Sequence, residues 1–438
     1  MVETVHSTGA WTPPGHIPKD EMIRISEAVL AEADVPYREY EDIFRIRSNG
    51  FDWDIGNVVY EPDSDKIAIG PDGKKIAIFM THGGASDWRS IERLARGFAG
   101  KRGVKVCSMT FPGRFYFGNE ARDWPGDTLT ADKIVRTPIW LRDEIIGADQ
   151  YDIKIDSSHR EIYGSRSYAV ARPGSVFYHR MAAFPKAFVD SMMDICARHF
   201  PADDWSIYVH GHSTGGPFVH TLLQRVVNVK GLIGIENSSF GEFYHAMAGH
   251  DWPTPFNYLL VRTWRELARY KGAELALQEG EKPLFRLAQV MEEIFEYWDE
   301  VKRFPQFKAE NWFHNRTPRI LQEAARIAAA HQGLNGAATE KLVEDYLSYG
   351  VPLSGPGVKR IPPILHGINA FSRDHTPENY ELIAQLFEKL EHPPKFGVIQ
   401  LGTGIHSYWR SEPGLPEGVC PVVVKIWFDA IMNGWYDG

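Results

Sequence analysis

Cysteine is scarce in this chain of 438 residues. Only Cys107, Cys196 and Cys420 occur, far apart in the sequence. An odd number of separated cysteines gives no disulfide framework and matches no spacing of metal-binding cysteines. We therefore expect no metal site, and the sequence indicates no other cofactor.

An excess of basic charge and long hydrophobic runs are also lacking. The chain has 48 Lys and Arg residues against 57 Asp and Glu, a formal net charge of -9. Because nucleic-acid-binding proteins normally carry a basic surplus, we expect no nucleic-acid partner. No run of eighteen apolar residues is present, so no membrane span is expected. The first fifteen residues show neither the basic nor the apolar segment of a secretory signal, which favours a cytoplasmic location.

The pattern of apolar segments that is present predicts an α/β fold. Short apolar runs at 75–81 and 104–110 flank a helical pattern at 88–99. Similar runs recur at 205–210, 230–236, 361–366 and 395–401, again with helical patterns between them. Strands that alternate with helices indicate a mostly parallel sheet covered on both faces.

The same pattern divides the chain into segments. Residues 1–40 are expected to be an N-terminal extension with a helix near 22–33. The α/β core should comprise 41–238 and 360–438, and it begins with a hairpin of strands 42–47 and 52–60 around Ser48-Asn49-Gly50. Residues 239–359 have an almost wholly helical pattern and are expected to be an insertion. Residues 111–175 break the βα rhythm, and a segment of that length is more often functional or locally folded than a bare loop.

The strongest chemical signal is Gly211-His212-Ser213-Thr214-Gly215, between a predicted strand and a predicted helix. This is the G-x-S-x-G pattern of a nucleophile elbow, in which a sharp turn exposes a serine hydroxyl above the sheet. A serine hydroxyl is a weak nucleophile and needs a neighbouring base. His406, where the last strand runs into a glycine loop, is the best-placed base, and His366 is the alternative.

Acyl chemistry also requires N–H donors for the oxyanion that develops in the reaction. His82-Gly83-Gly84 follows the strand before the first helix of the core. A glycine turn there can direct the Gly84 N–H at a carbonyl oxygen. The N–H of Thr214 would supply the second donor.

In this order of glycine loop, elbow and histidine, the sequence resembles the α/β-hydrolase superfamily over about 42–236 and 360–435. The resemblance implies a twisted, mostly parallel sheet and a helical cap or lid at 239–359. It also implies a serine hydrolase that uses Ser213 and His406 on a small-molecule carboxylic ester or lactone. Amide or C–C bond hydrolysis and acyl transfer use the same catalytic groups. A non-catalytic binding protein on this scaffold is less favoured, because both groups are present. The oligomeric state is not indicated.

Two residues compete for the acid that orients the histidine. In most α/β-hydrolases it follows the penultimate strand, where the usual spacing falls on Ala370 and the next carboxylate is Asp374. A smaller group of esterases in the superfamily carries a glutamate after the strand that follows the nucleophile helix, and this chain has Glu236 there. Glu236 is favoured over Asp374, since a carboxylate at the end of an apolar run needs a partner when it is buried.

Overall fold

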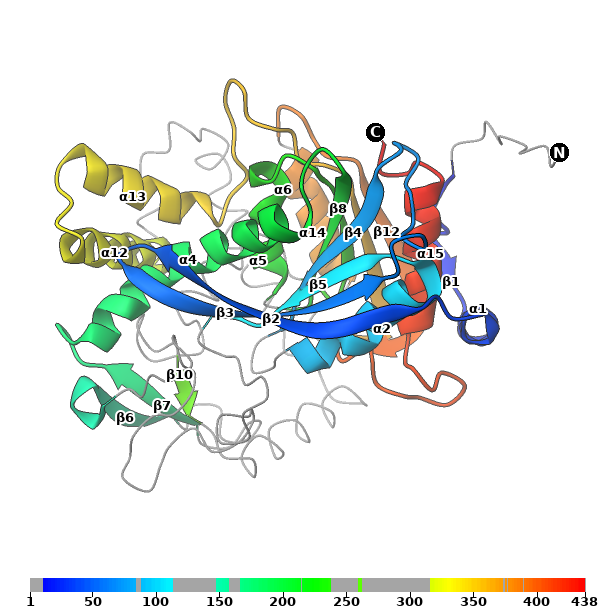
Figure 1. The fold of residues 1–438 in the computed structure, drawn as a ribbon, viewed down its shortest axis with the longest axis horizontal. Helices are drawn as coiled ribbons and strands as arrows, with labels where there is room; N and C mark the ends of the chain where they lie inside the picture. Colours follow the sequence, from blue (N-terminus) through cyan, green and yellow to red (C-terminus); the bar gives the residue numbers. More distant parts are fainter. Residues whose placement is uncertain are drawn as a thin grey trace.

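A nine-stranded sheet forms the centre of the protein in this computed structural model (Figure 1). The structure describes residues 11–83, 88–112, 147–156, 166–213, 215–237, 259–261, 316–372, 375, 377–388 and 390–437. In sheet order the strands are β1 (His16–Ile17), β12 (Phe396–Ile405), β11 (Ile364–Phe371), β9 (Val229–Ile235), β8 (Trp205–Gly211), β4 (Lys75–Thr81), β5 (Lys105–Met109), β3 (Phe51–Pro62) and β2 (Tyr37–Ser48). Neighbours pair in parallel from β1 to β5, and β3 and β2 continue the sheet antiparallel. The predicted α/β class is therefore confirmed.

Helices cover both faces of this sheet, as its apolar strands require. One face packs against α1 (Lys19–Ala31), α2 (Glu92–Arg102) and α15 (Cys420–Met432). The other packs against α4 (Val176–His199), α5 (Gly216–His220), α6 (Leu222–Arg225) and α14 (Pro377–Glu388). Short 3-10 turns lie at Trp88–Ile91 and Ala148–Gln150. The sheet lies between the two hydrophobic clusters, and successive side chains along its strands belong alternately to one cluster and the other.

The predicted hairpin is confirmed at the antiparallel edge. Strands β2 and β3 pair along their full lengths, from Tyr37 opposite Pro62 to Ser48 opposite Phe51. Asn49 and Gly50 form the turn with φ of 51° and 86°. Asn-Gly suits a two-residue hairpin turn because both positions need the left-handed conformation.

In the nine-stranded sheet, the structure adds one strand that was not predicted and extends another. Within the expected N-terminal extension, β1 lengthens the sheet beside β12. Strand β11 does not end at His366 but continues to Phe371, with a register irregularity against β12 between Asn369 and Phe371. Residues 367–371, predicted to be a loop, are therefore strand.

A second, three-stranded antiparallel sheet joins two segments that are distant in sequence. Strands β6 (Tyr151–Asp156) and β7 (Arg166–Ala171) lie within the predicted excursion at 111–175, which therefore contains local structure. Strand β10 (Leu259–Val261) pairs with β7. The prediction of an almost wholly helical pattern at 239–359 is wrong at β10, since three residues are too few for a periodicity to reveal.

The later part of the expected insertion is helical, as predicted, with α12 (Arg316–His331) and α13 (Ala337–Ser348). Tyr346 of α13 is fully buried, donates to the Ala182 carbonyl at 2.6 Å and accepts from the Asn49 amide at 2.7 Å. These contacts dock α13 on α4 and on the β2–β3 turn. Most of 239–315 lies outside the described residues, so a cap at 239–359 stays a prediction.

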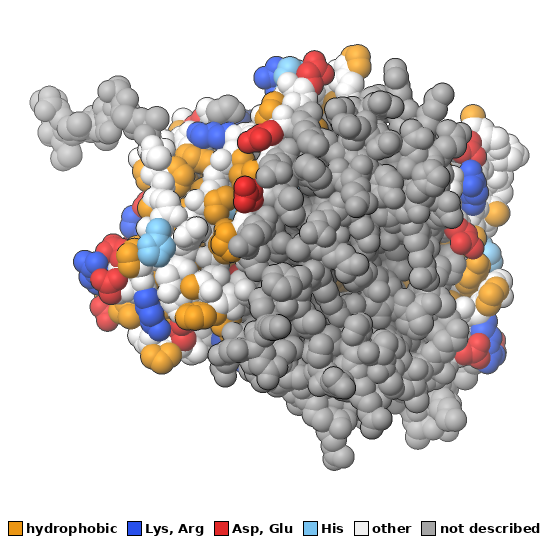
Figure 2. Space-filling model, turned by 180° about the vertical axis from the view of Figure 1, so that it is seen from behind, with side chains coloured by type: hydrophobic (Ala, Val, Ile, Leu, Met, Phe, Trp, Pro, Cys, Tyr) orange, Lys and Arg blue, Asp and Glu red, His pale blue; other side chains and the backbone are white. Residues whose placement is uncertain are grey.

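The described helices and the face drawn in Figure 2 bear on whether a membrane span or a uniformly charged surface is present. None of the helices described is both long enough and apolar enough to cross a bilayer. Seen from behind, the described surface carries acidic and basic side chains interspersed with hydrophobic ones (Figure 2).

Trp427 on α15 anchors that helix to the sheet. Its ring is fully buried, and its indole N–H donates to the Leu365 carbonyl at 3.0 Å. Trp427→Ala should lower the free energy of unfolding by about 3–5 kcal/mol, because it leaves a cavity. Urea denaturation measures the change. Lys425→Ala on the same helix is the control: its half-exposed pair with Asp429 should be worth about 0.5 kcal/mol or less. Equal effects of the two substitutions would contradict this role of Trp427.

Candidate active site

Ser213, Glu236 and His406 come together at one edge of the sheet. Ser213 lies two residues after β8, while Glu236 and His406 directly follow β9 and β12. All three strands are parallel, so their carboxyl ends meet at the same edge, where ligands bind in open α/β sheets.

The elbow holds Ser213 in a strained backbone conformation. Ser213 has φ of 50°, in the left-handed region that non-glycine residues rarely adopt. Its N–H donates to the carbonyl of Glu236 at 2.5 Å, and Ser213 forms a parallel bridge with Asn237. Glu236 itself has φ of 49°. The two strained residues are thus hydrogen-bonded to each other, and this pairing fixes the elbow against the end of β9.

The two glycines of the elbow are required by close backbone contacts. A Cβ on Gly211 would lie 2.3 Å from the Gly215 carbonyl oxygen, and one on Gly215 would lie 2.3 Å from the His82 carbonyl oxygen. Both distances are far below contact, and both neighbours are backbone atoms. Only glycine therefore fits at either position.

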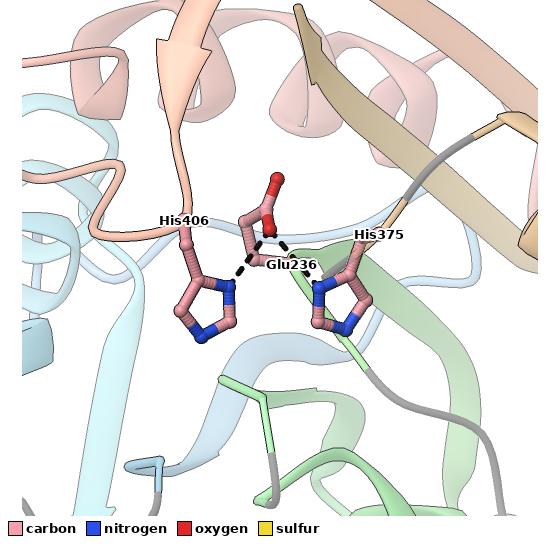
Figure 3. A group of neighbouring side chains, drawn as sticks. All are labelled: Glu236, His375 and His406. Atoms are coloured by element: carbon pink, nitrogen blue, oxygen red, sulfur yellow. Dashed lines mark hydrogen bonds and ion pairs between the residues drawn. The ribbon is translucent and has the colours of Figure 1, made fainter. Parts of the chain in front are cut away.

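Glu236 is a fully buried carboxylate that accepts three hydrogen bonds and lies in ion-pair contact with a second imidazole. Its Oε2 accepts from His406 Nδ1 at 2.9 Å and from the Ser372 hydroxyl at 2.6 Å, and it lies 3.1 Å from His375 Nδ1. Its Oε1 accepts from the Asn369 amide at 2.9 Å. Figure 3 shows both imidazoles directing Nδ1 at the same carboxylate oxygen.

These donors keep Glu236 ionised. Burial raises the pKa of this carboxyl, but hydrogen bonds and charge interactions with His375 and His406 outweigh it, so the pKa of Glu236 lies well below its usual range. Since an ionised carboxylate can only accept, His406, whose Nδ1 is hydrogen-bonded to it, carries its proton on Nδ1. For His406 this leaves Nε2 as the basic nitrogen.

His212 ties the elbow to the His406 loop. Its Nε2–H donates to the His406 carbonyl at 3.0 Å, and the two rings are 4.6 Å apart between centroids. Burial holds the pKa of His212 well below its usual value, so the ring is neutral.

The glycine loop after β4 lies beside the nucleophile. A Cβ on Gly83 would lie 3.2 Å from the Ser213 Cβ. His82 fixes this loop, because its Nε2 accepts from the Phe111 N–H at 3.0 Å and its Nδ1–H donates to the Gly83 carbonyl at 2.7 Å. Gly84 and Thr214, the expected oxyanion donors, lie outside the described residues.

Sequence reasoning missed three of the residues around Glu236, namely Asn369, Ser372 and His375. In the segment 367–377, interpreted as a loop, only a carboxylate was considered, as the acid that orients the histidine. The useful signal was present: polar residues that follow a parallel strand reach the edge shared by Ser213 and His406.

The other sequence candidates are placed differently. Asp374 lies outside the described residues. His366, the alternative base, lies within β11 and not at its end, and its buried ring packs against Tyr380 and Phe396. The structure therefore does not bring His366 to the edge where Ser213 lies.

Glu236, His375 and His406 are also the described residues that could hold a metal ion. Their ligand atoms lie within 4.8 Å of one another. Carboxylate oxygen and imidazole nitrogen are both ligands of zinc in proteins. The sequence analysis foresaw no such group.

Comparisons with solved structures give low TM-scores at low sequence identity. No family model matches the chain, and no curated protein matches it. Among solved structures, the acylaminoacyl peptidase of Pyrococcus horikoshii has a TM-score of 0.39 at 10% identity, covering 94% of this chain and 44% of that one. This chain thus spans less than half of the peptidase. A thermostable esterase from Pseudomonas putida has a TM-score of 0.35 at 12% identity, covering 95% of this chain and 90% of that one. The brefeldin A esterase, a bacterial homologue of human hormone sensitive lipase, has a TM-score of 0.35 at 12% identity, covering 98% of this chain and 89% of that one.

The class of fold rests on the chain's own geometry. A mostly parallel sheet carries a G-x-S-x-G turn between β8 and α5, and a glycine loop follows β4 beside it. This is an α/β-hydrolase fold, as the resemblance implied.

Gly211→Ala tests the elbow. The added Cβ would meet the Gly215 carbonyl oxygen at 2.3 Å, so we expect a loss of several kcal/mol, on the order of 3 or more, in the free energy of unfolding. The matched control is Gly15→Ala, where the added Cβ meets nothing within 4 Å. Urea denaturation curves compare the two variants. A Gly211→Ala protein as stable as the control would refute the close contact.

Proposed function

We propose that this protein is a serine hydrolase that cleaves a carboxylic ester or lactone through an acyl-enzyme. One observation carries the proposal: a strained serine at an elbow shares a sheet edge with a histidine whose Nδ1 donates to a buried carboxylate 2.9 Å away. That combination of strained nucleophile, base and orienting acid is the arrangement nucleophilic catalysis needs.

In the proposed mechanism, Ser213 Oγ attacks the carbonyl carbon while His406 Nε2 takes the hydroxyl proton. Glu236 stabilises the imidazolium that forms, and the N–H groups of Gly84 and Thr214 stabilise the oxyanion. Collapse of the tetrahedral intermediate breaks the C–O bond, and His406 returns the proton to the leaving alcohol. Water, activated by His406, then hydrolyses the acyl-enzyme and regenerates Ser213.

Amide hydrolysis, C–C bond hydrolysis and acyl transfer would use the same groups. The choice among them depends on the substrate pocket, for which residues 111–175 and the proposed cap at 239–359 are the candidates. A panel of esters, lactones and amides, assayed with the wild type and Ser213→Ala in parallel, separates these reactions.

One test of the proposed function concerns the nucleophile. Ser213→Ala should lower kcat by on the order of 10⁵-fold or more and abolish covalent labelling by a fluorophosphonate probe, because no other group can form the acyl-enzyme. The fold should persist, since alanine fits the same backbone. Turnover at the wild-type rate in Ser213→Ala would rule out this function.

Another test of the proposed function concerns the acid. Glu236→Gln should lower kcat by about 10³–10⁴-fold, because the amide no longer stabilises the imidazolium of His406. Asp374→Asn is the matched control and should stay within about tenfold of the wild type. The opposite ranking of the two variants would assign the acid to Asp374.

A further inference from the structure

His375 is a second histidine on the proposed catalytic carboxylate. Its Nδ1 lies 3.1 Å from Glu236 Oε2, the oxygen that also accepts from His406 Nδ1 at 2.9 Å. The imidazoles of His375 and His406 are stacked, with centroids 5.2 Å apart and planes 8° from parallel. A Ser-His-Glu mechanism has no task for this second ring.

The chain holds His375 in place through Ser372. The backbone N–H of His375 donates to the Ser372 hydroxyl oxygen at 3.0 Å. That hydroxyl in turn donates to Glu236 Oε2 at 2.6 Å. The His375 side chain is 1% exposed. Ser372 and His375, which follow β11, thus both contact the same carboxylate oxygen.

Three polar groups contact Oε2 and restrict how the carboxylate can turn. Rotation about the last side-chain bond of Glu236 would break the hydrogen bonds to Ser372 and His406 and the close contact with His375 together, and would leave buried polar groups unpaired. With His375 absent, a rotated carboxylate loses fewer of these contacts. The orientation that His406 requires would then be less strongly favoured over others.

We propose that His375 is a positioning residue, whose Nδ1, in contact with Oε2 at 3.1 Å, holds the Glu236 carboxylate in the orientation in which Oε2 accepts from His406. The inference rests on the proposed serine hydrolase function. It assigns His375 no proton transfer and no contact with substrate. Any side chain that places a neutral N–H donor at the position of Nδ1 should therefore replace it.

The test is a set of three substitutions at one position. In His375→Asn the amide nitrogen takes the place of Nδ1, in His375→Gln it takes the place of Nε2, and His375→Phe keeps the ring without a donor. We expect His375→Phe and His375→Gln to lower kcat by about 10–100-fold with KM little changed, as for other partners that orient a catalytic group. His375→Asn should recover most of the wild-type kcat.

Two controls make the test decisive. His392→Asn, an exposed histidine beside Glu391, should leave kcat unchanged. Thermal unfolding of each variant separates loss of fold from loss of positioning. If His375→Phe fails to fold, the comparison of His375→Gln with His375→Asn still decides, since both are polar and smaller than the imidazole.

Each outcome bears on a different claim. A wild type that neither hydrolyses the panel nor reacts with the fluorophosphonate refutes the proposed function. The positioning role is then read from NMR of ¹⁵N-histidine-labelled protein, in which His375→Phe should alter the hydrogen-bonded Nδ1–H signal of His406 and His375→Asn should preserve it. An active wild type with equal kcat in all three variants overturns the positioning role. Stoichiometric metal in the purified protein, lost in His375→Asn, would overturn it by making His375 a ligand.

Discussion

The burial of one negative charge constrains the whole active edge. Glu236 is completely inaccessible to water, and an ionised carboxylate in such a place is costly unless donors surround it. The donors come from three places in the chain: Asn369 within β11, Ser372 after it, and His406 after β12, and His375 adds an ion-pair contact. The carboxyl ends of β11 and β12 must therefore lie level with the carboxyl end of β9. Asn369 reinforces the match, because its amide also donates to the Ile405 carbonyl, next to His406.

The same residue supports the strain at the nucleophile. A left-handed conformation at a serine costs on the order of 1–3 kcal/mol and persists only where the surroundings over-determine it. Here the Glu236 carbonyl accepts the Ser213 N–H, while Asn237 donates its side-chain amide to the Gly211 carbonyl at 2.7 Å. The end of β9 thus holds the elbow through its backbone and the histidines through its side chain. The position of the serine and the orientation of the base are set by one strand end.

The parts of this arrangement that follow local rules could be predicted from the sequence. The Asn49-Gly50 turn and the elbow glycines have no alternative residues of equal fit, so their patterns are specific. The donors around Glu236 follow no such rule. Whether Asn369 faces the carboxylate depends on β11 continuing past His366, and that continuation is fixed by pairing with β12, about thirty residues away. The three residues of β10 likewise become strand only through β7. Long-range pairing of this kind leaves no periodicity in a short segment.

The second sheet joins described strands of the excursion at 111–175 and of the expected insertion at 239–359, and connects them to the core. Strands β6 and β7 come from the excursion and β10 comes from the insertion, so these segments are hydrogen-bonded to each other. The strands of the excursion are tied to the start of α4: Gln150 accepts from the Arg172 N–H through its backbone and from the Phe177 N–H through its side chain. Helix α4 in turn packs on the main sheet and contacts α13 through Tyr346. The sheet of β6, β7 and β10 is therefore connected to the main sheet through α4, and it contributes none of the strand ends that carry Ser213, Glu236 and His406. This separation would let the substrate preference of the proposed hydrolase change while the acyl-transfer groups keep their geometry.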